Sequence, residues 1–313
     1  MGKKKFTGVS QFLARFRGWI QAGAALLTNL HLPNFLKGGL YQGAGKTVCV
    51  PGLNCYSCPA ASGACPIGAF QAVVGSSKFS FSYYITGILI LLGVLLGRFI
   101  CGFLCPFGWF QELLHKIPSR KLSTRKLKPL RYLKYAILLV MVFLLPAFLV
   151  NDVGMGDPFF CKYLCPQGVL EGAIPLSLAN SGIRAALGSL FTWKLGILLV
   201  VIVLSVLFYR PFCKWICPLG AFYALLNKVS LVQMKVDQSK CISCGKCARA
   251  CKMDVDVTKS PNHTECIRCG MCVRACPTNA VRFRCGFGMG KQGTVLPEKT
   301  NKQMNDIVKE KKS

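Results

Sequence analysis

Eight cysteines near the C-terminus, arranged in two runs of identical spacing, constrain the fold of this chain more than any other feature. The runs are CISCGKCARAC from Cys241 to Cys251 and CIRCGMCVRAC from Cys266 to Cys276. Both have the C-x2-C-x2-C-x3-C spacing in which three thiolates of one run and the last thiolate of the other hold each of two [4Fe–4S] clusters. A structural zinc site needs four ligands per ion and can be built from C-x2-C pairs alone. It does not need a third cysteine and a further x3-C step in each of two runs, so the spacing favours iron–sulfur over zinc.

The spacing predicts a crossed ligand assignment that ties both runs into one small α+β module, residues 231–285. One predicted ligand set is Cys241, Cys244, Cys247 and Cys276, and the other is Cys251, Cys266, Cys269 and Cys272. This stretch resembles bacterial two-cluster ferredoxins, except that Lys252 stands where the first run would usually have proline. Basic residues between the ligands either raise the cluster potentials and favour an acidic electron donor or form an ordinary solvated surface. They are Lys246, Arg249, Lys252, Arg268 and Arg274.

The rest of the chain has the composition of a membrane protein. Of its 313 residues, 52% are hydrophobic and only 16% are charged, and the apolar residues are bunched into runs. Because a bilayer core needs roughly 20 helical residues, we predict spans at 79–97, 135–151 and 190–209. A fourth at 18–36 contains several polar residues, and the basic residues ahead of it would also suit a signal peptide, but its apolar stretch is weak and it lacks a convincing cleavage site. We therefore predict an all-α membrane bundle of four spans over residues 1–230.

The charge distribution predicts how this bundle is oriented. The segment 98–134 holds nine Lys or Arg against one acid, Glu112, and should be cytoplasmic, whereas the acidic-leaning segment 151–189 should lie outside. Four spans then put both termini on the cytoplasmic side of a bacterial cytoplasmic membrane, although the loop 37–78 must lie outside with three lysines and no acid. The net charge of +28 is explained by this asymmetry and by anionic lipid, so we expect no nucleic-acid partner. The lysine-rich stretch 286–313 is predicted to be a disordered tail.

An internal duplication places most of the remaining cysteines. The tetrad C-P-x-G begins at Cys65, Cys105, Cys165 and Cys217, and the last three have another cysteine four residues earlier. The segments that start at Arg98 and Arg210 align without a gap. We infer two repeats, 55–116 and 151–228, each with an outer cysteine motif, a span and an inner cysteine pair.

Parallel repeats related by an axis along the membrane normal would bring equivalent pairs together. The inner pairs Cys101, Cys105, Cys213 and Cys217 would then form a four-thiolate site at the cytoplasmic face, suited to a [4Fe–4S] cluster. At the outer face Cys161 and Cys165 would meet Cys65 together with either Cys58 or Cys55, and we assign Cys58. The two cysteines left over, one of them Cys49, could pair as a disulfide. The alternative for any single cysteine is a buried apolar filler, and Cys285 has no predicted role. Metal sites on both faces would make the protein a transmembrane electron route.

The C-x3-C-P pairs at Cys101/Cys105 and Cys213/Cys217, each after a predicted span and combined with the C-terminal double run, resemble those of NapH-type and NosR-type membrane iron–sulfur proteins. The resemblance implies an electron-transfer subunit of a membrane oxidoreductase of quinol dehydrogenase type. Its partners would be a quinol pool or cytoplasmic donor, and a reductase or flavoprotein.

Two questions stay open at the level of the sequence. Similar motifs in the accessory iron–sulfur protein of cytochrome oxidase assembly imply an alternative role, the reduction of copper for another enzyme, although no Met or His cluster for copper is visible. If quinone binds, the segment with Trp109, Gln111, Glu112 and His115 is the candidate, or else it is only a polar helix face. The direction of electron flow does not follow from the residues.

Overall fold

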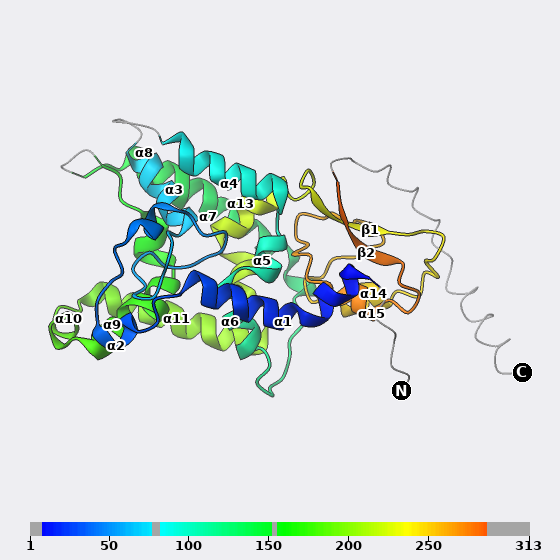
Figure 1. The fold of residues 1–313 in the computed structure, drawn as a ribbon, viewed down its shortest axis with the longest axis horizontal. Helices are drawn as coiled ribbons and strands as arrows, with labels where there is room; N and C mark the ends of the chain where they lie inside the picture. Colours follow the sequence, from blue (N-terminus) through cyan, green and yellow to red (C-terminus); the bar gives the residue numbers. More distant parts are fainter. Residues whose placement is uncertain (1–7, 77–81, 152–154, 287–313) are drawn as a thin grey trace, which may run out of the picture.

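The computed structural model describes residues 8–76, 82–151 and 155–286. A helical bundle forms one end of the long axis, and the small C-terminal module with its two strands forms the other (Figure 1). The first residues of the predicted span at 79–97 and, apart from Gly286, the predicted tail at 286–313 lie outside the described residues.

Most of the bundle consists of helices joined by short turns. The α-helices are α1 (Val9–Thr28), α2 (Asn34–Lys37), α3 (Pro66–Gly75), α4 (Tyr83–Leu95), α5 (Phe99–Phe103), α6 (Pro106–Leu114), α7 (Leu133–Ile137), α8 (Leu145–Phe148), α9 (Ile174–Ala179), α10 (Ser181–Ala185), α11 (Ser189–Leu207), α12 (Pro211–Trp215) and α13 (Pro218–Leu226). The 3-10 segments are η1 (Ala44–Thr47) and η2 (Arg125–Tyr132), and the π-helical segments are η3 (Leu138–Leu144), η4 (Phe160–Leu164) and η5 (Val169–Ala173).

The C-terminal module is a small α+β unit, as predicted. Helices α14 (Lys246–Ala250) and α15 (Met271–Ala275) each follow one cysteine loop. Each helix begins after a glycine in the left-handed region, Gly245 at φ 67° and Gly270 at φ 75°, a conformation that favours glycine. Strands β1 (Val232–Val236) and β2 (Val281–Cys285) pair antiparallel and join the two ends of the module.

Two helical stretches are long and apolar enough to cross a bilayer, Leu127–Phe148 and Ser189–Leu207. They contain most of the predicted spans 135–151 and 190–209. The predicted span 79–97 is shorter as a helix, because α4 ends at Leu95 and Gly97 turns the chain at φ 55°. A Cβ at Gly97 would lie 2.7 Å from the Arg268 guanidinium, so the turn is held tightly against the C-terminal module.

The predicted fourth span, 18–36, does not form as predicted. Helix α1 instead begins at Val9 and ends at Thr28, and it buries Arg17 and Gln21 against the bundle. The described part of the chain is thus a mostly helical bundle with two candidate spans, and a four-span arrangement stays a prediction.

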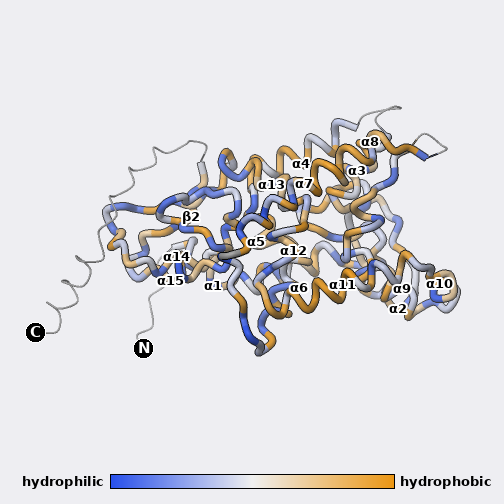
Figure 2. Tube along the Cα trace, turned by 180° about the vertical axis from the view of Figure 1, so that it is seen from behind, coloured by the Kyte–Doolittle hydropathy of each residue, from blue (hydrophilic) through white to orange (hydrophobic). Residues whose placement is uncertain are grey.

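Apolar residues make up most of the helices of the bundle (Figure 2), and many of their large side chains are exposed. On α11 the side chains of Leu199, Val200 and Val203 are more than half exposed, and on α4 Leu91 is 56% exposed. Apolar patches of this kind are typical of faces that lipid or another protein covers. The trace of the C-terminal module mixes polar and apolar residues in the same view.

Buried ion pairs fasten the C-terminal module to the bundle. Glu265 lies 2.9 Å from the Arg98 guanidinium and 2.6 Å from Lys134 Nζ, and all three side chains are nearly inaccessible to solvent. Asp254 lies 3.1 Å from Lys214 Nζ in a second buried pair. Arg98 comes three residues before Cys101, and Lys214 directly follows Cys213. The module is therefore held at the inner cysteine motifs of both repeats.

Candidate metal centres

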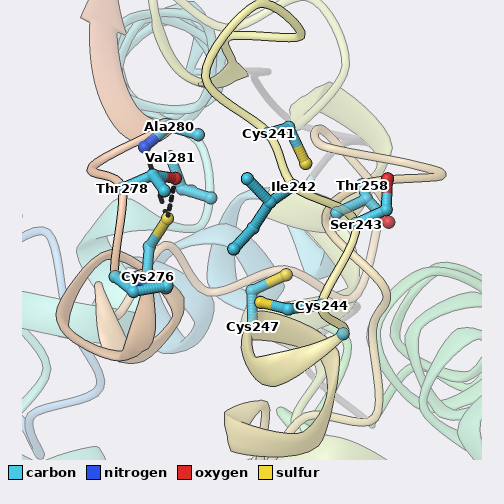
Figure 3. A pocket seen from close by; sticks show the side chains of 12 residues that line it. Cys241, Ile242, Ser243, Cys244, Cys247, Thr258, Cys276, Thr278, Ala280 and Val281 are labelled. Carbon is cyan, nitrogen blue, oxygen red and sulfur yellow. Dashed lines mark hydrogen bonds between the residues drawn. The ribbon is translucent and has the colours of Figure 1, made fainter. Parts of the chain in front are cut away.

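The first predicted ligand set of the module lines a single cavity. Cys241, Cys244 and Cys247 border it from one side and Cys276 from the other (Figure 3). Burial acts to raise the pKa of the Cys276 thiol, but hydrogen bonds from Thr278 and from backbone N–H groups, Ala280 among them, outweigh it and lower the pKa. The site therefore favours a thiolate at Cys276, the form that binds metal.

The second predicted set lines a separate cavity, which faces the bundle. Its four cysteines come from both runs: Cys251, Cys266, Cys269 and Cys272. The rest of the lining is largely apolar and includes Met253, Val255 and Ile267. Each cavity thus combines three cysteines of one run with the last cysteine of the other, which is the arrangement that a crossed assignment requires.

A third group of cysteines lies inside the bundle, where the two inner motifs meet. Cys101 lies on α5 and Cys213 on α12, while Cys105 and Cys217 directly precede α6 and α13. All four are buried, and the sulfur of Cys217 interacts electrostatically with the other three. We call these four residues the inner group.

The fourth group combines the outer motifs of the two repeats. Cys65 interacts electrostatically with Cys165 and Cys55, and Cys161 interacts with Cys65 and Cys55. We call Cys55, Cys65, Cys161 and Cys165 the outer group. Cys58, which the sequence predicts here with Cys55 as the alternative, also interacts electrostatically with Cys55, and its sulfur lies 3.6 Å from Asn29 Oδ1. Cys49 and Cys58 are both free thiols.

The C-P-x-G tetrad explains how these groups are built. Proline takes the first position of α3, α6 and α13, where its missing N–H costs nothing, so each preceding cysteine stands at a helix N-terminus. The glycine of each outer tetrad lies beside the partner motif: a Cβ at Gly68 would be in ordinary contact with Cys161 Sγ at 3.7 Å, and one at Gly168 with Cys55 Sγ at 3.5 Å. Helix N-termini favour negative charge, so these ends suit anionic ligands.

Neighbouring groups are in close contact. A Cβ at Gly102, next to Cys101, would lie 2.3 Å from the carbonyl oxygen of Ile267, which lines the second cavity of the module. A Cβ at Gly52 would lie 2.8 Å from the Cα of Cys105, and Gly52 lies three positions before Cys55 of the outer group. The Cα of Cys55 is therefore at most roughly 15 Å from the Cα of Cys105. The outer loop folds deep into the bundle.

Buried guanidinium groups beside the inner group test whether it fits an anionic cluster. Arg98 and Arg210 are fully buried, and in the described residues Arg98 Nε and Nη2 and Arg210 Nη2 have no hydrogen-bond partner. Arg98 interacts electrostatically with Cys101, and Arg210 interacts with Cys213 and Cys105. Unpaired buried donors are costly. The sulfur atoms of an anionic [4Fe–4S] cluster held by the four cysteines would supply acceptors, so the residues fit this group.

Over the part of the chain that the structure describes, no three or more His, Cys, Asp or Glu side chains are spaced to hold a single metal ion.

The candidate quinone segment is largely occupied by internal contacts. Glu112 accepts hydrogen bonds from Arg17, Tyr209 and Arg210 Nε, the last at 2.8 Å. Gln111 donates to Cys213. These contacts are those of a structural polar cluster, and a quinone site here stays a prediction.

Comparison with known proteins reveals two kinds of 4Fe-4S binding domain in the chain. One model, named Fer4_5, matches residues 63–84, 80–125, 134–174 and 190–237, so Cys65 and the pairs Cys101/Cys105, Cys161/Cys165 and Cys213/Cys217 each fall in a match. The other, named Fer4, matches 234–255 and 260–282 in the C-terminal module. No solved structure matches the chain.

Curated relatives carry related names. The chain is 28% identical to the uncharacterized protein MJ0750 of Methanocaldococcus jannaschii over 55% of its own length and 66% of the relative. It is 27% identical to the putative electron transport protein YccM of Escherichia coli over 54% of this chain and 45% of the relative. It is 26% identical to the ferredoxin-type protein NapH of Haemophilus influenzae over 56% of this chain and 54% of the relative.

The matched segments therefore span two thirds or less of these relatives. Proteins named NosR match as well. Together the domain matches and the relatives confirm the resemblance drawn from the cysteine motifs and place the chain among the NapH- and NosR-like, ferredoxin-type iron–sulfur proteins.

Proposed function

We propose that this protein carries electrons through a membrane along a row of four [4Fe–4S] clusters. Each bound cluster would supply a one-electron redox couple. The observation that carries the proposal is that sixteen cysteines lie in four groups of four, that the loop leading to Cys55 packs against Cys105, and that Gly102, next to Cys101, packs against the module. The ligands would be the two module sets, the inner group and the outer group, with Cys55 in place of Cys58.

The close approach of the inner and outer groups supports a route across the bilayer. A hydrocarbon core is about 30 Å thick, which is long for direct transfer between sites at its two surfaces. The contact of Gly52 with Cys105 reduces this separation, because it brings the loop that holds Cys55 to the inner group. Positive charge in 98–134 and the two apolar helices support a location in the cytoplasmic membrane with both termini inside.

The proposed partners are redox proteins on each side. A quinol pool or a soluble donor would exchange electrons with the module in the cytoplasm, and a reductase or flavoprotein would do so at the outer group. The names of the relatives, an electron transport protein and a ferredoxin-type protein, support this assignment to electron transfer.

Iron content is the first expected result. Protein purified without oxygen should hold about 16 iron atoms and as much sulfide, four per cluster. Cys55→Ala should reduce this to about 12 by removing an outer ligand, and the matched variant Cys58→Ala should leave it unchanged. Iron and sulfide analysis of the three proteins measures this. Loss of iron in Cys58→Ala but not in Cys55→Ala would reverse the assignment, and about 8 iron in the unaltered protein would leave only the module.

Electron crossing tests the proposed function itself. We expect that sealed vesicles containing the holoprotein, with titanium(III) citrate outside and ferricyanide trapped inside, will bleach ferricyanide, whereas vesicles with the iron-free protein will not. Absorbance of the trapped ferricyanide measures the crossing. If protein with its full iron reduced ferricyanide only after detergent opened the vesicles, the transmembrane route would be wrong and the protein would be a one-sided relay.

A further inference from the structure

Two glutamines occupy equivalent positions beside the inner and outer groups. Gln71 lies in CPIGAFQ, six residues after Cys65, and Gln111 lies in CPFGWFQ, six residues after Cys105. Both side chains are completely buried, Gln71 on α3 and Gln111 on α6. A buried amide needs hydrogen-bond partners, so the atoms that these two side chains reach reveal their role.

Each glutamine reaches across to a cysteine of the other repeat. Gln71 Nε2 lies 3.1 Å from Cys161 Sγ in the outer group, and Gln111 Nε2 lies 3.2 Å from Cys213 Sγ in the inner group. The two acceptors are also equivalent, since each is the first cysteine of a C-x3-C-P pair. The same N–H···S contact is therefore built twice, once in each group.

Neighbouring backbone groups fix which end of each amide faces the sulfur. Gln71 Oε1 accepts a hydrogen bond from the Phe160 N–H at 3.0 Å, a contact that an NH₂ group cannot make. Gln111 Nε2 donates to the Phe107 carbonyl at 3.3 Å, a contact that a carbonyl oxygen cannot make. In both cases the amide N–H is the end that points to the cysteine.

The equivalent residues of the other two tetrads act differently. Glu171, six residues after Cys165, accepts a hydrogen bond from the Cys55 N–H at 3.1 Å. Tyr223, six residues after Cys217, donates to the Pro51 carbonyl at 3.0 Å. Among these four positions only the glutamines donate to sulfur, so each group receives one such bond.

We propose that Gln71 and Gln111 set the reduction potentials of the outer and inner clusters, an inference that rests on the proposed function. A hydrogen bond to a ligand sulfur stabilises negative charge, and a [4Fe–4S] cluster carries one more negative charge when reduced. Each glutamine therefore raises the potential of the cluster held by the cysteine that it contacts. They are positioning residues and bind no iron themselves.

Leucine substitutions remove the donor while they keep an apolar side chain of similar size. In Gln111→Leu the equilibrium constant for one-electron reduction of the inner cluster should fall by about tenfold, because hydrogen bonds to charged groups are the strong ones. For a one-electron couple this is a fall of about 59 mV. Gln71→Leu should do the same at the outer cluster. Redox titration followed by electron paramagnetic resonance measures both.

Gln21→Leu is the matched control, because Gln21 is equally buried but donates to the Gly102 carbonyl at 3.0 Å and not to a sulfur. Its potentials should not move. Full iron with unchanged potentials in Gln71→Leu and Gln111→Leu would overturn the inference and leave the proposed function standing. About 8 iron in the unaltered protein would instead refute the membrane clusters themselves.

A second measurement needs no variant. Protein grown with glutamine labelled with ¹⁵N in the side-chain amide should show ¹⁵N hyperfine coupling in the pulsed resonance spectra of the reduced membrane clusters. If these clusters are present but show no such coupling, the inference is wrong whatever the leucine variants do.

Discussion

Replacing Cys105 by alanine is expected to stop electron crossing altogether. Cys105 belongs to the inner group, which contacts the module through Gly102 and the outer loop through Gly52. Loss of this ligand should remove one cluster, so that iron falls from about 16 to about 12 atoms. Ferricyanide reduction inside the vesicles should fall to the level of the iron-free protein, while the module keeps its resonance signals.

Cys49→Ala is the control for this variant. Cys49 is as buried as Cys105, at 7% against 8% exposure, but it belongs to none of the four groups. It should retain about 16 iron atoms and normal crossing. If Cys105→Ala also kept full iron and full crossing, the inner group would not be a metal site and the buried guanidinium groups beside it would need another partner.

The sequence predicted those features that depend on spacing and symmetry. The crossed sets of the module follow from two identical runs, and the same cysteines line the two cavities. The meeting of Cys101 and Cys105 with Cys213 and Cys217 follows from two parallel repeats. A repeated motif carries its own geometry, so spacing is enough to predict which cysteines meet, and their role as cluster ligands stays a prediction.

Features that depend on tertiary packing were not predicted. Hydropathy extended the span at 79–97 to Gly97, whereas the helix ends at Leu95 because Gly97 packs against Arg268 of the module. Arg268 was interpreted as one of several cations between the ligands, yet it is buried and donates to the Leu96 and Asn227 carbonyls. Which of Cys55 and Cys58 belongs to the outer group likewise depends on how the loop folds back, and Cys55 is the proposal made above.

One signal was present in the sequence and was not used. The tetrads at Cys65 and Cys105 continue identically into Phe and Gln at the fifth and sixth positions after the cysteine, whereas those at Cys165 and Cys217 do not. A polar residue kept in an apolar helix at the same place in two motifs indicates a shared contact. The contacts of Gln71 and Gln111 with sulfur account for it.

Arg98 also has a larger role than the sequence suggested. The sequence shows only that it lies three residues before Cys101. In the structure its guanidinium donates to Glu265 and to the Thr264 carbonyl, both at 2.9 Å, so it also holds the module in place. Glu265 is thus the carboxylate on which this part of the interface depends.

Replacing Glu265 by glutamine is expected to loosen the module from the bundle. Burial alone would raise the pKa of Glu265, but the cations Arg98 and Lys134 lower it to about 2, so the carboxylate is ionised at neutral pH. Glutamine keeps the shape but leaves both buried cations without a counter-charge. Removing one partner of a buried ion pair costs about 3–5 kcal/mol. We expect the cluster absorption of the holoprotein to bleach at a clearly lower denaturant concentration.

The matched control for Glu265→Gln is Asp237→Asn, within the same module. Asp237 lies 3.1 Å from Arg282, but the Arg282 side chain is 51% exposed, and surface pairs contribute about 0–1 kcal/mol. Asp237→Asn should therefore bleach at almost the same denaturant concentration as the unaltered protein, and both variants should keep full iron before denaturant is added.

Because Glu265 bridges the inner motif and the cysteine loop that begins at Cys266, its loss should also slow reduction of the inner cluster by a donor that reacts at the module. Equal bleaching midpoints in the two variants would mean that the ion pairs of Glu265 do not hold the module. Docking would then depend on the hydrogen bonds that the side chains of Arg268 and Asn227 donate to backbone carbonyls across the interface.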